Sequence, residues 1–127
     1  MRLAVANQDS RVVTHHAGTT RRFVVYAVEP FEEPVEVDRL DLPEGMTLRE
    51  FHGHHGHPLY AVDVLIAGSL GQGFKQRMAK HGIIAVCTEE SDPVKAARKF
   101  LLSPVGMLKQ SLELGRCWPG VEPRSSP

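Results

Sequence analysis

The alternation of apolar and polar residues predicts strands in the first third of the chain. Residues 2–8 alternate and end in polar turn residues, and residues 22–29 are rich in β-branched and aromatic side chains. A brief strand over residues 11–13 would form a hairpin with the first. After a turn between two prolines, residues 35–42 alternate again, which predicts an edge or half-buried strand. We therefore expect an antiparallel group of strands.

The second half of the chain predicts strands and helices in alternation. Residues 62–68 and 83–87 are nearly continuous apolar runs, typical of strands buried on both faces. Between them, residues 71–82 fit a helix that ends at a glycine. A second helix would begin at Pro93, with Asp92 as its cap. These segments predict a strand–helix–strand–helix unit.

The remaining segments have weaker signals. Thr47 and Glu50 fit a capping box that would open a turn or two of helix. A further helix is expected from Pro104, and the end of the chain is rich in proline and serine. The order of elements predicts one α/β domain over residues 1–103, with a mixed sheet whose antiparallel strands come first. Residues 104–127 would form a helical extension and a loose tail.

Composition narrows the class of protein. The chain has 127 residues, 42% apolar residues and no formal net charge, which is typical of a globular domain. Zero net charge disfavours a nucleic-acid binder that neutralises many phosphates. No apolar run approaches the roughly 20 residues of a membrane helix, and Met1 leads directly into a strand, so we expect a cytoplasmic protein without a signal peptide. Cys87 and Cys117 indicate no disulfide framework, and Cys87 is expected in the core.

A glycine-rich turn is the first candidate for chemistry. Residues 68–73, GSLGQG, join a predicted strand to a predicted helix. Gly68, Gly71 and Gly73 would let backbone N–H groups and the helix N-terminus approach an anion. The spacing is neither that of a dinucleotide fold nor that of a P-loop. An ordinary tight turn explains the glycines equally well, so both interpretations stay open.

A histidine-rich run is the second candidate. Four histidines stand within six positions: His52, His54, His55 and His57. Imidazole suits zinc, copper, nickel or iron, and His54 and His57 would reach one ion if the loop folded back on itself. The alternative is an exposed polar loop that contains glycine and proline.

Beyond these features, the sequence resembles a known family. The segments RLAVANQ, VVTHHAGTTRRFVVYAVE, VDVLIAGSLGQGFKQRMAKHGI and TEESDP are similar to the dinitrogenase iron–molybdenum cofactor biosynthesis family, which includes NifX, NafY and the C-terminal domain of NifB. The resemblance covers residues 1–102. It implies a ribonuclease H-like α/β fold and a non-enzymatic protein that carries iron–sulfur or iron–molybdenum cofactor precursors between nitrogenase assembly proteins.

The resemblance also implies site residues. The family motif Ser-x-His-Phe-Gly aligns with Thr14, His15, His16, Ala17 and Gly18, so that His16 takes the histidine position and Ala17 replaces the phenylalanine. Two cysteines cannot supply the thiolates of a stable cluster. One imidazole from His16, with Arg22 facing the negative charge, would suit a carrier that must release its cargo. The cargo would lie between residues 14–18 and the glycine turn.

Three functions are therefore weighed. The first is a cluster carrier that uses His16, Thr14, Gly18, Arg22 and the glycine turn. The second is a mononuclear metal-binding or metal-sensing module at the histidine run, for zinc or nickel. The third, a two-metal nuclease, would need converging carboxylates, and only Asp9 and Asp63 stand near strand ends.

Overall fold

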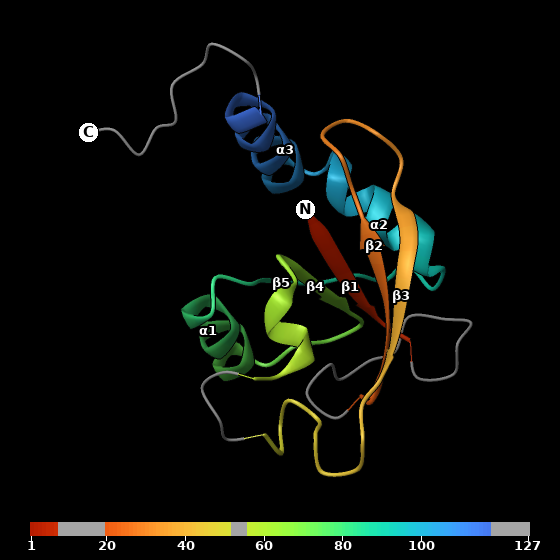
Figure 1. The fold of residues 1–127 in the computed structure, drawn as a ribbon, viewed down its shortest axis with the longest axis vertical. Helices are drawn as coiled ribbons and strands as arrows, with labels where there is room; N and C mark the ends of the chain where they lie inside the picture. Colours follow the sequence, from red (N-terminus) through yellow and green to blue (C-terminus); the bar gives the residue numbers. More distant parts are fainter. Residues whose placement is uncertain (8–19, 52–55, 118–127) are drawn as a thin grey trace.

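The computed structural model describes residues 1–7, 20–51 and 56–117, the side chains of 115–117 excepted (Figure 1). A five-stranded sheet lies at the centre, with helices on both of its faces. The elements are β1 (Arg2–Ala6), β2 (Arg22–Ala27), β3 (Val35–Asp41), the 3₁₀ helix η2 (Pro58–Ala61), β4 (Val64–Ala67), α1 (Gln72–Lys80), β5 (Ile84–Cys87), α2 (Pro93–Leu102) and α3 (Pro104–Cys117).

The sheet combines antiparallel and parallel pairs. Its strand order is β3-β2-β1-β4-β5. β1 and β2 pair antiparallel, as do β2 and β3, whereas β4 lies parallel to both β1 and β5. The predicted α/β class and mixed sheet are confirmed. The strand predicted over residues 11–13 lies outside the described residues.

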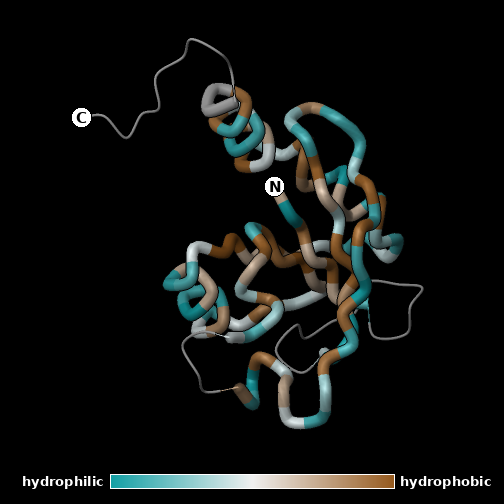
Figure 2. The backbone as a smooth tube through the Cα atoms, in the orientation of Figure 1, coloured by the Kyte–Doolittle hydropathy of each residue, from teal (hydrophilic) through white to brown (hydrophobic). Residues whose placement is uncertain are grey.

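Strand alternation divides the core into two layers. Ala4, Phe23 and Leu65 face α1 and the segment before β4, whereas Val5 and Ile66 face α2. In Figure 2 the central strands are mostly brown, as expected for a sheet covered on both faces. Each face of the sheet is thus buried by a helix that follows a parallel strand.

The last strand differs from its prediction. Residues 83–87 were expected to be buried on both faces, but Ile84–Val86 are only half-buried. Cys87 is exposed, so the prediction of a core cysteine is wrong. The reason is the position of β5 at the edge of the sheet, where no further strand covers it. β3, at the other edge, is mostly exposed, as its alternation predicted.

One of the two hydrogen bonds of the predicted capping box forms, from Glu50 N to Thr47 Oγ1, and no helix follows it over residues 48–51. The Thr47 hydroxyl donates to Glu50 Oε1 at 2.6 Å, and the Glu50 N–H donates back to Thr47 Oγ1 at 3.3 Å. The chain then continues as a turn. Arg77 of α1 donates to the carbonyl oxygens of Leu48 and Phe51, which a longer helix would have used for its own hydrogen bonds.

Polar groups attach α3 to the rest of the protein. The buried Gln110 side chain accepts from Phe31 N at 2.8 Å and donates to Leu101 O at 2.9 Å. Glu113 lies 3.3 Å from the amino group of Met1. Leu108 and Leu112, which stand four residues apart in α3, are both exposed. The predicted tail after α3 lies outside the described residues.

Candidate functional site

The carboxyl ends of the parallel strands meet at one end of the sheet (Figure 1). Val5 pairs with Ile66, so Asn7 and Gly68 follow at equivalent positions of neighbouring strands. Arg22 begins the antiparallel strand on the other side of β1, where its carbonyl oxygen accepts the Asn7 N–H at 2.9 Å. Ligands of open α/β sheets bind beyond this end of the strands. Arg22 and Gly68, predicted as cofactor-binding residues, are therefore brought to the same rim.

The glycine turn leads into α1 without a side-chain cap. Gly71 is the N-cap residue, and no side chain accepts a hydrogen bond there. A Cβ atom on Gly71 or Gly73 would meet nothing within 4 Å. Neither glycine is required by local packing. The first N–H groups of an α-helix have no partners within the helix, so an anion could bind at such an uncapped start. The role of Gly68, Gly71 and Gly73 in anion binding stays a prediction.

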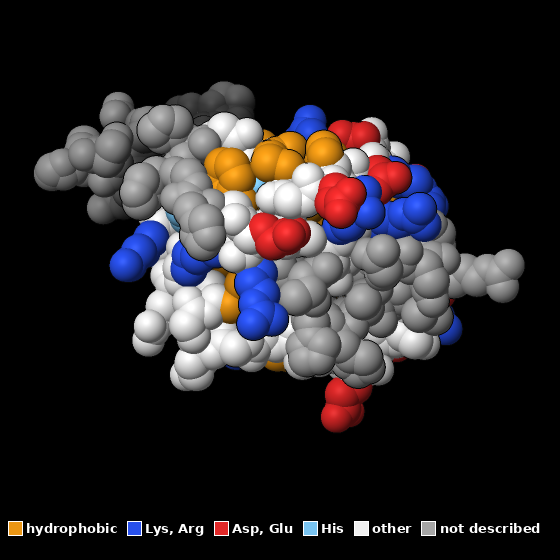
Figure 3. Space-filling model, turned by 90° about the horizontal axis from the view of Figure 1, so that it is seen from below, with side chains coloured by type: hydrophobic (Ala, Val, Ile, Leu, Met, Phe, Trp, Pro, Cys, Tyr) orange, Lys and Arg blue, Asp and Glu red, His pale blue; other side chains and the backbone are white. Residues whose placement is uncertain are grey.

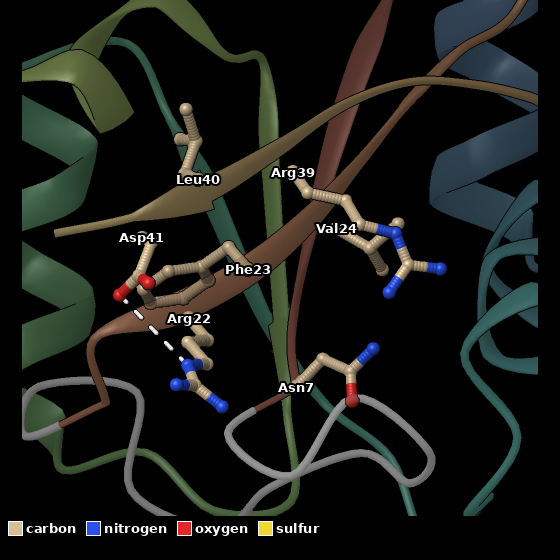
Figure 4. Close-up of a pocket in the computed structure, with 7 residues that line it drawn as sticks. All are labelled: Asn7, Arg22, Phe23, Val24, Arg39, Leu40 and Asp41. Atoms are coloured by element: carbon tan, nitrogen blue, oxygen red, sulfur yellow. Dashed lines mark ion pairs between the residues drawn. The ribbon is translucent and has the colours of Figure 1, made fainter.

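A pocket of about 210 Å³ opens on the α2 side of the sheet at this same end (Figure 4). Arg22 Nε lies 3.8 Å from Asp41 Oδ1, and both side chains are at least half exposed. Arg39 donates twice to Glu36, at 2.7 and 3.1 Å, and this hydrogen bonding lowers the pKa of the Glu36 carboxyl. The pocket is lined by Asn7, Arg22, Phe23, Val24, Arg39, Leu40 and Asp41.

Asn7 is the polar residue that the sequence interpretation missed. The residue is 5% exposed, and within residues 1–7, 20–51 and 56–117 its Oδ1 atom has no hydrogen-bond partner. A signal was present in the sequence: Leu3 and Val5 precede it at the same strand periodicity, so the next residue facing α2 is an asparagine where an apolar residue would continue the pattern.

His57 is a structural residue in this arrangement. It is buried and is the N-cap of η2, where its Nδ1 accepts from Leu59 N at 3.1 Å. Its Nε2 lies 2.7 Å from the carbonyl oxygen of Met46. Burial lowers the pKa of the imidazole, and nearby Arg77 lowers it further, against an opposing effect of the Met46 hydrogen bond. Because both ring nitrogens have protein partners, the predicted role of His57 as a metal ligand would require one of these bonds to break.

Several predicted residues fall outside the described part of the chain. These are Thr14, His16 and Gly18 of the family motif, and His54 of the histidine run. Within residues 1–7, 20–51 and 56–117, no group of three or more His, Cys, Asp or Glu side chains is placed to hold a metal ion. The same part of the chain contains no helix that is long and apolar enough to cross a membrane.

Charge is mixed rather than segregated on the face drawn in Figure 3, where basic and acidic side chains lie next to each other. Asp63, one of the two carboxylates considered for a nuclease, precedes β4 and accepts from Arg2 N at 2.8 Å. It therefore lies at the amino ends of the strands, opposite the rim of Asn7 and Gly68. The other carboxylate, Asp9, is outside the described residues.

Comparison with known proteins identifies the family. A sequence model described as "Dinitrogenase iron-molybdenum cofactor" matches residues 1–103. Among solved structures, the protein PH0822 is 21% identical over 80% of this chain and 89% of its own, with a TM-score of 0.57. A Thermotoga protein described as a candidate NifB protein of the DUF35 family is 18% identical over 78% of this chain and 85% of its own, with a TM-score of 0.50.

Because both sequence identities are low, these structural likenesses support the fold alone. No curated protein matches the sequence. The family match covers the strands, α1 and α2, and with them Asn7, Arg22 and the glycine turn. The predicted family is confirmed: the chain belongs to the dinitrogenase iron–molybdenum cofactor family.

Proposed function

We propose that this protein binds an iron–sulfur or iron–molybdenum cofactor precursor and carries it during nitrogenase-type metallocluster assembly. The observation that carries the proposal is the family match over residues 1–103. The carboxyl end of the parallel strands supports the proposal, because α/β proteins bind ligands at this end of the sheet. Arg22, Gly68 and the N-terminus of α1, which has no side-chain cap, all lie there.

The fold proposed for this carrier is ribonuclease H-like. Three antiparallel strands come first in the chain, two parallel strands follow on the other side of β1, and helices cover both faces. This order agrees with the fold that the family resemblance implies. The role is that of a cytoplasmic carrier rather than an enzyme, and its partners would be the nitrogenase cofactor-assembly proteins that give and receive the cargo.

The chemistry of the proposed site is that of reversible binding. An iron–sulfur cargo is anionic and rich in sulfide acceptors, so N–H donors and a guanidinium stabilise it without covalent attachment. His16 would supply the protein's one ligand to iron, with Thr14 and Gly18 shaping its loop. Gly68, Gly71 and Gly73 would let the backbone approach the cargo closely. A single strong ligand permits the release that a carrier requires.

The test is anaerobic transfer of a cluster from a donor assembly protein to the purified chain, followed by visible absorbance and iron analysis. His16→Ala is expected to abolish cluster binding while the far-ultraviolet circular dichroism stays unchanged. His15→Ala, a change of the neighbouring histidine in the same motif, is the matched control and should bind as the wild type does. Equal binding by the wild type and His16→Ala would refute the role of His16.

The histidine run can be examined in the same experiment. A triple variant that replaces His52, His54 and His55 with alanine leaves the N-cap His57 in place. Loss of cluster binding in this variant, with binding retained in His16→Ala, would move the site to the histidine run. Metal analysis of protein purified without an affinity tag measures zinc and nickel directly, as the mononuclear alternative requires.

A further inference from the structure

The side chain of Asn7 is buried with an unsatisfied acceptor. Only 5% of the residue is exposed, and Oδ1 has no hydrogen-bond partner among the residues that the structure describes. A buried amide oxygen that lacks a donor destabilises the folded state, because the same atom is hydrogen-bonded to water in the unfolded chain. Native proteins rarely keep such a group unless it serves something other than folding.

In the described part of the chain, the structural contacts of Asn7 do not depend on its carboxamide oxygen. Its backbone N–H donates to Arg22 O at 2.9 Å, and any residue other than proline would make that bond. The preceding residues on the same face, Leu3 and Val5, belong to the apolar layer against α2. An apolar side chain at position 7 would extend this layer, so the asparagine is a departure from the pattern that the fold itself favours.

The carboxamide borders a pocket that is lined by two arginines and by one acid, Asp41, which lies 3.8 Å from Arg22. Asn7 and Arg22 line the pocket from adjacent antiparallel strands, and Figure 4 shows their side chains on the same side of the sheet. Arg39, the other guanidinium of the pocket, is held by two hydrogen bonds to Glu36. The Asn7 amide and Arg22 therefore adjoin the same space at the carboxyl end of β1.

We infer that Asn7 is a binding residue for the anionic cargo, to which its amide donates a hydrogen bond beside the guanidinium of Arg22. The inference rests on the proposed function and adds to its site Asn7, the residue that follows β1. A carboxamide offers two N–H donors as well as an oxygen acceptor, and it exchanges their places by turning about its terminal bond. Next to a cation, the N–H groups suit a sulfide or carboxylate of a negatively charged ligand.

The experiment uses a synthetic [4Fe–4S] cluster with small thiolate ligands, titrated anaerobically into the full chain. Asn7→Leu keeps the branched shape of the side chain and removes its polar atoms. We expect it to weaken cluster binding by about tenfold or more, the usual effect of losing a hydrogen bond to a charged group. Asn7→Asp should weaken binding further, since it adds a negative charge and removes the donors.

A second measurement separates binding from folding. Without cargo, Asn7→Leu should unfold at a higher urea concentration than the wild type, because the unsatisfied oxygen is gone. Arg22→Gln should also weaken binding, whereas Arg98→Gln, which removes an equally exposed arginine paired with Glu33, should not.

The outcomes distinguish the inference from the function on which it rests. Unchanged cluster affinity in Asn7→Leu, with affinity lost in His16→Ala, would overturn the role of Asn7 alone. A lower unfolding midpoint in Asn7→Leu would make the carboxamide a structural group and would likewise overturn it. Absence of binding by the wild type would overturn the proposed function and this inference together.

Discussion

The Nδ1 atom of His57 accepts a hydrogen bond from the backbone N–H of Leu59 at 3.1 Å. Since Nε2 lies 2.7 Å from the Met46 carbonyl oxygen, the neutral ring with its proton on Nε2 satisfies both partners. Protonation of Nδ1 would place an N–H group against the Leu59 N–H and open the start of η2. His57 is thus a cap whose function depends on its being uncharged.

This relationship predicts a pH-dependent stability. The pKa of His57 is lowered by folding from its ordinary value of 6.5, so the unfolded chain takes up the proton first as the pH falls. The free energy of unfolding should therefore decline as the pH is lowered through about 6.5 and below. Urea unfolding of the wild type and of His57→Asn between pH 5 and 8 measures the effect. Asparagine still caps but does not titrate, so equal pH slopes in the two proteins would contradict the assignment.

The close approach of Gly106 to Phe100 predicts a large effect of a single methyl group. A Cβ atom on Gly106 would lie 1.9 Å from the Phe100 carbonyl oxygen, which is a backbone atom and cannot rotate away. Gly106→Ala should lower the free energy of unfolding by about 2–3 kcal/mol. Gly73→Ala is the matched control, because its Cβ would have open space and alanine favours a helix by roughly 0.5–1 kcal/mol. A similar unfolding midpoint for both variants would show that α3 adjusts freely.

Asp92 is expected to stabilise α2 as its N-cap. Its Oδ1 accepts from Val94 N at 3.0 Å and from Lys95 N at 3.3 Å. Asp92→Ala should cost about 1 kcal/mol in chemical denaturation, whereas Asp92→Asn should stay close to the wild type. Glu89→Ala, an exposed acid of the same stretch, provides the comparison and should change stability by less than about 0.5 kcal/mol. If Glu89→Ala lowers the free energy of unfolding as much as Asp92→Ala does, the effect comes from the overall charge and not from the cap.

The exposed Cys87 predicts a reactive thiol at the end of β5. In a Cys117→Ser background, an aromatic disulfide reagent should modify Cys87 in the folded protein, because reactivity requires access to the sulfur. Absorbance of the released thiolate follows the reaction, and the same reagent in denaturant gives the total thiol. If the Cys87 thiol reacts only after denaturant is added, the thiol is buried in the folded protein and this prediction is wrong.

Local signals in the sequence were sufficient for most of the elements. Asp92 and Pro93 mark the start of α2 because a cap and a preset φ angle act within one turn. The glycine after α1 adopts a φ of +75°, the conformation for which a helix-ending glycine is selected. The family was likewise readable, since its motifs are short stretches of adjacent residues.

Only the tertiary structure decided which strands lie at the edges and which polar groups are buried. Two apolar runs of similar composition became β4, covered on both faces, and β5, exposed at one edge, because strand order is set by pairing between distant segments. His57 in the histidine run became a buried cap for the same reason: its partner Met46 is eleven residues earlier in the chain.

The candidate site divides in the same way. Sequence alone determined the family, the glycine turn and the importance given to His16 and Arg22, since these depend on residue type and spacing. Tertiary structure placed Asn7 beside Arg22, because the antiparallel register of β1 and β2 joins residues separated by fifteen positions. A buried polar atom without a partner is a property of the packed sheet, so no pattern of adjacent residues could show that Asn7 Oδ1 lacks a partner among the described residues.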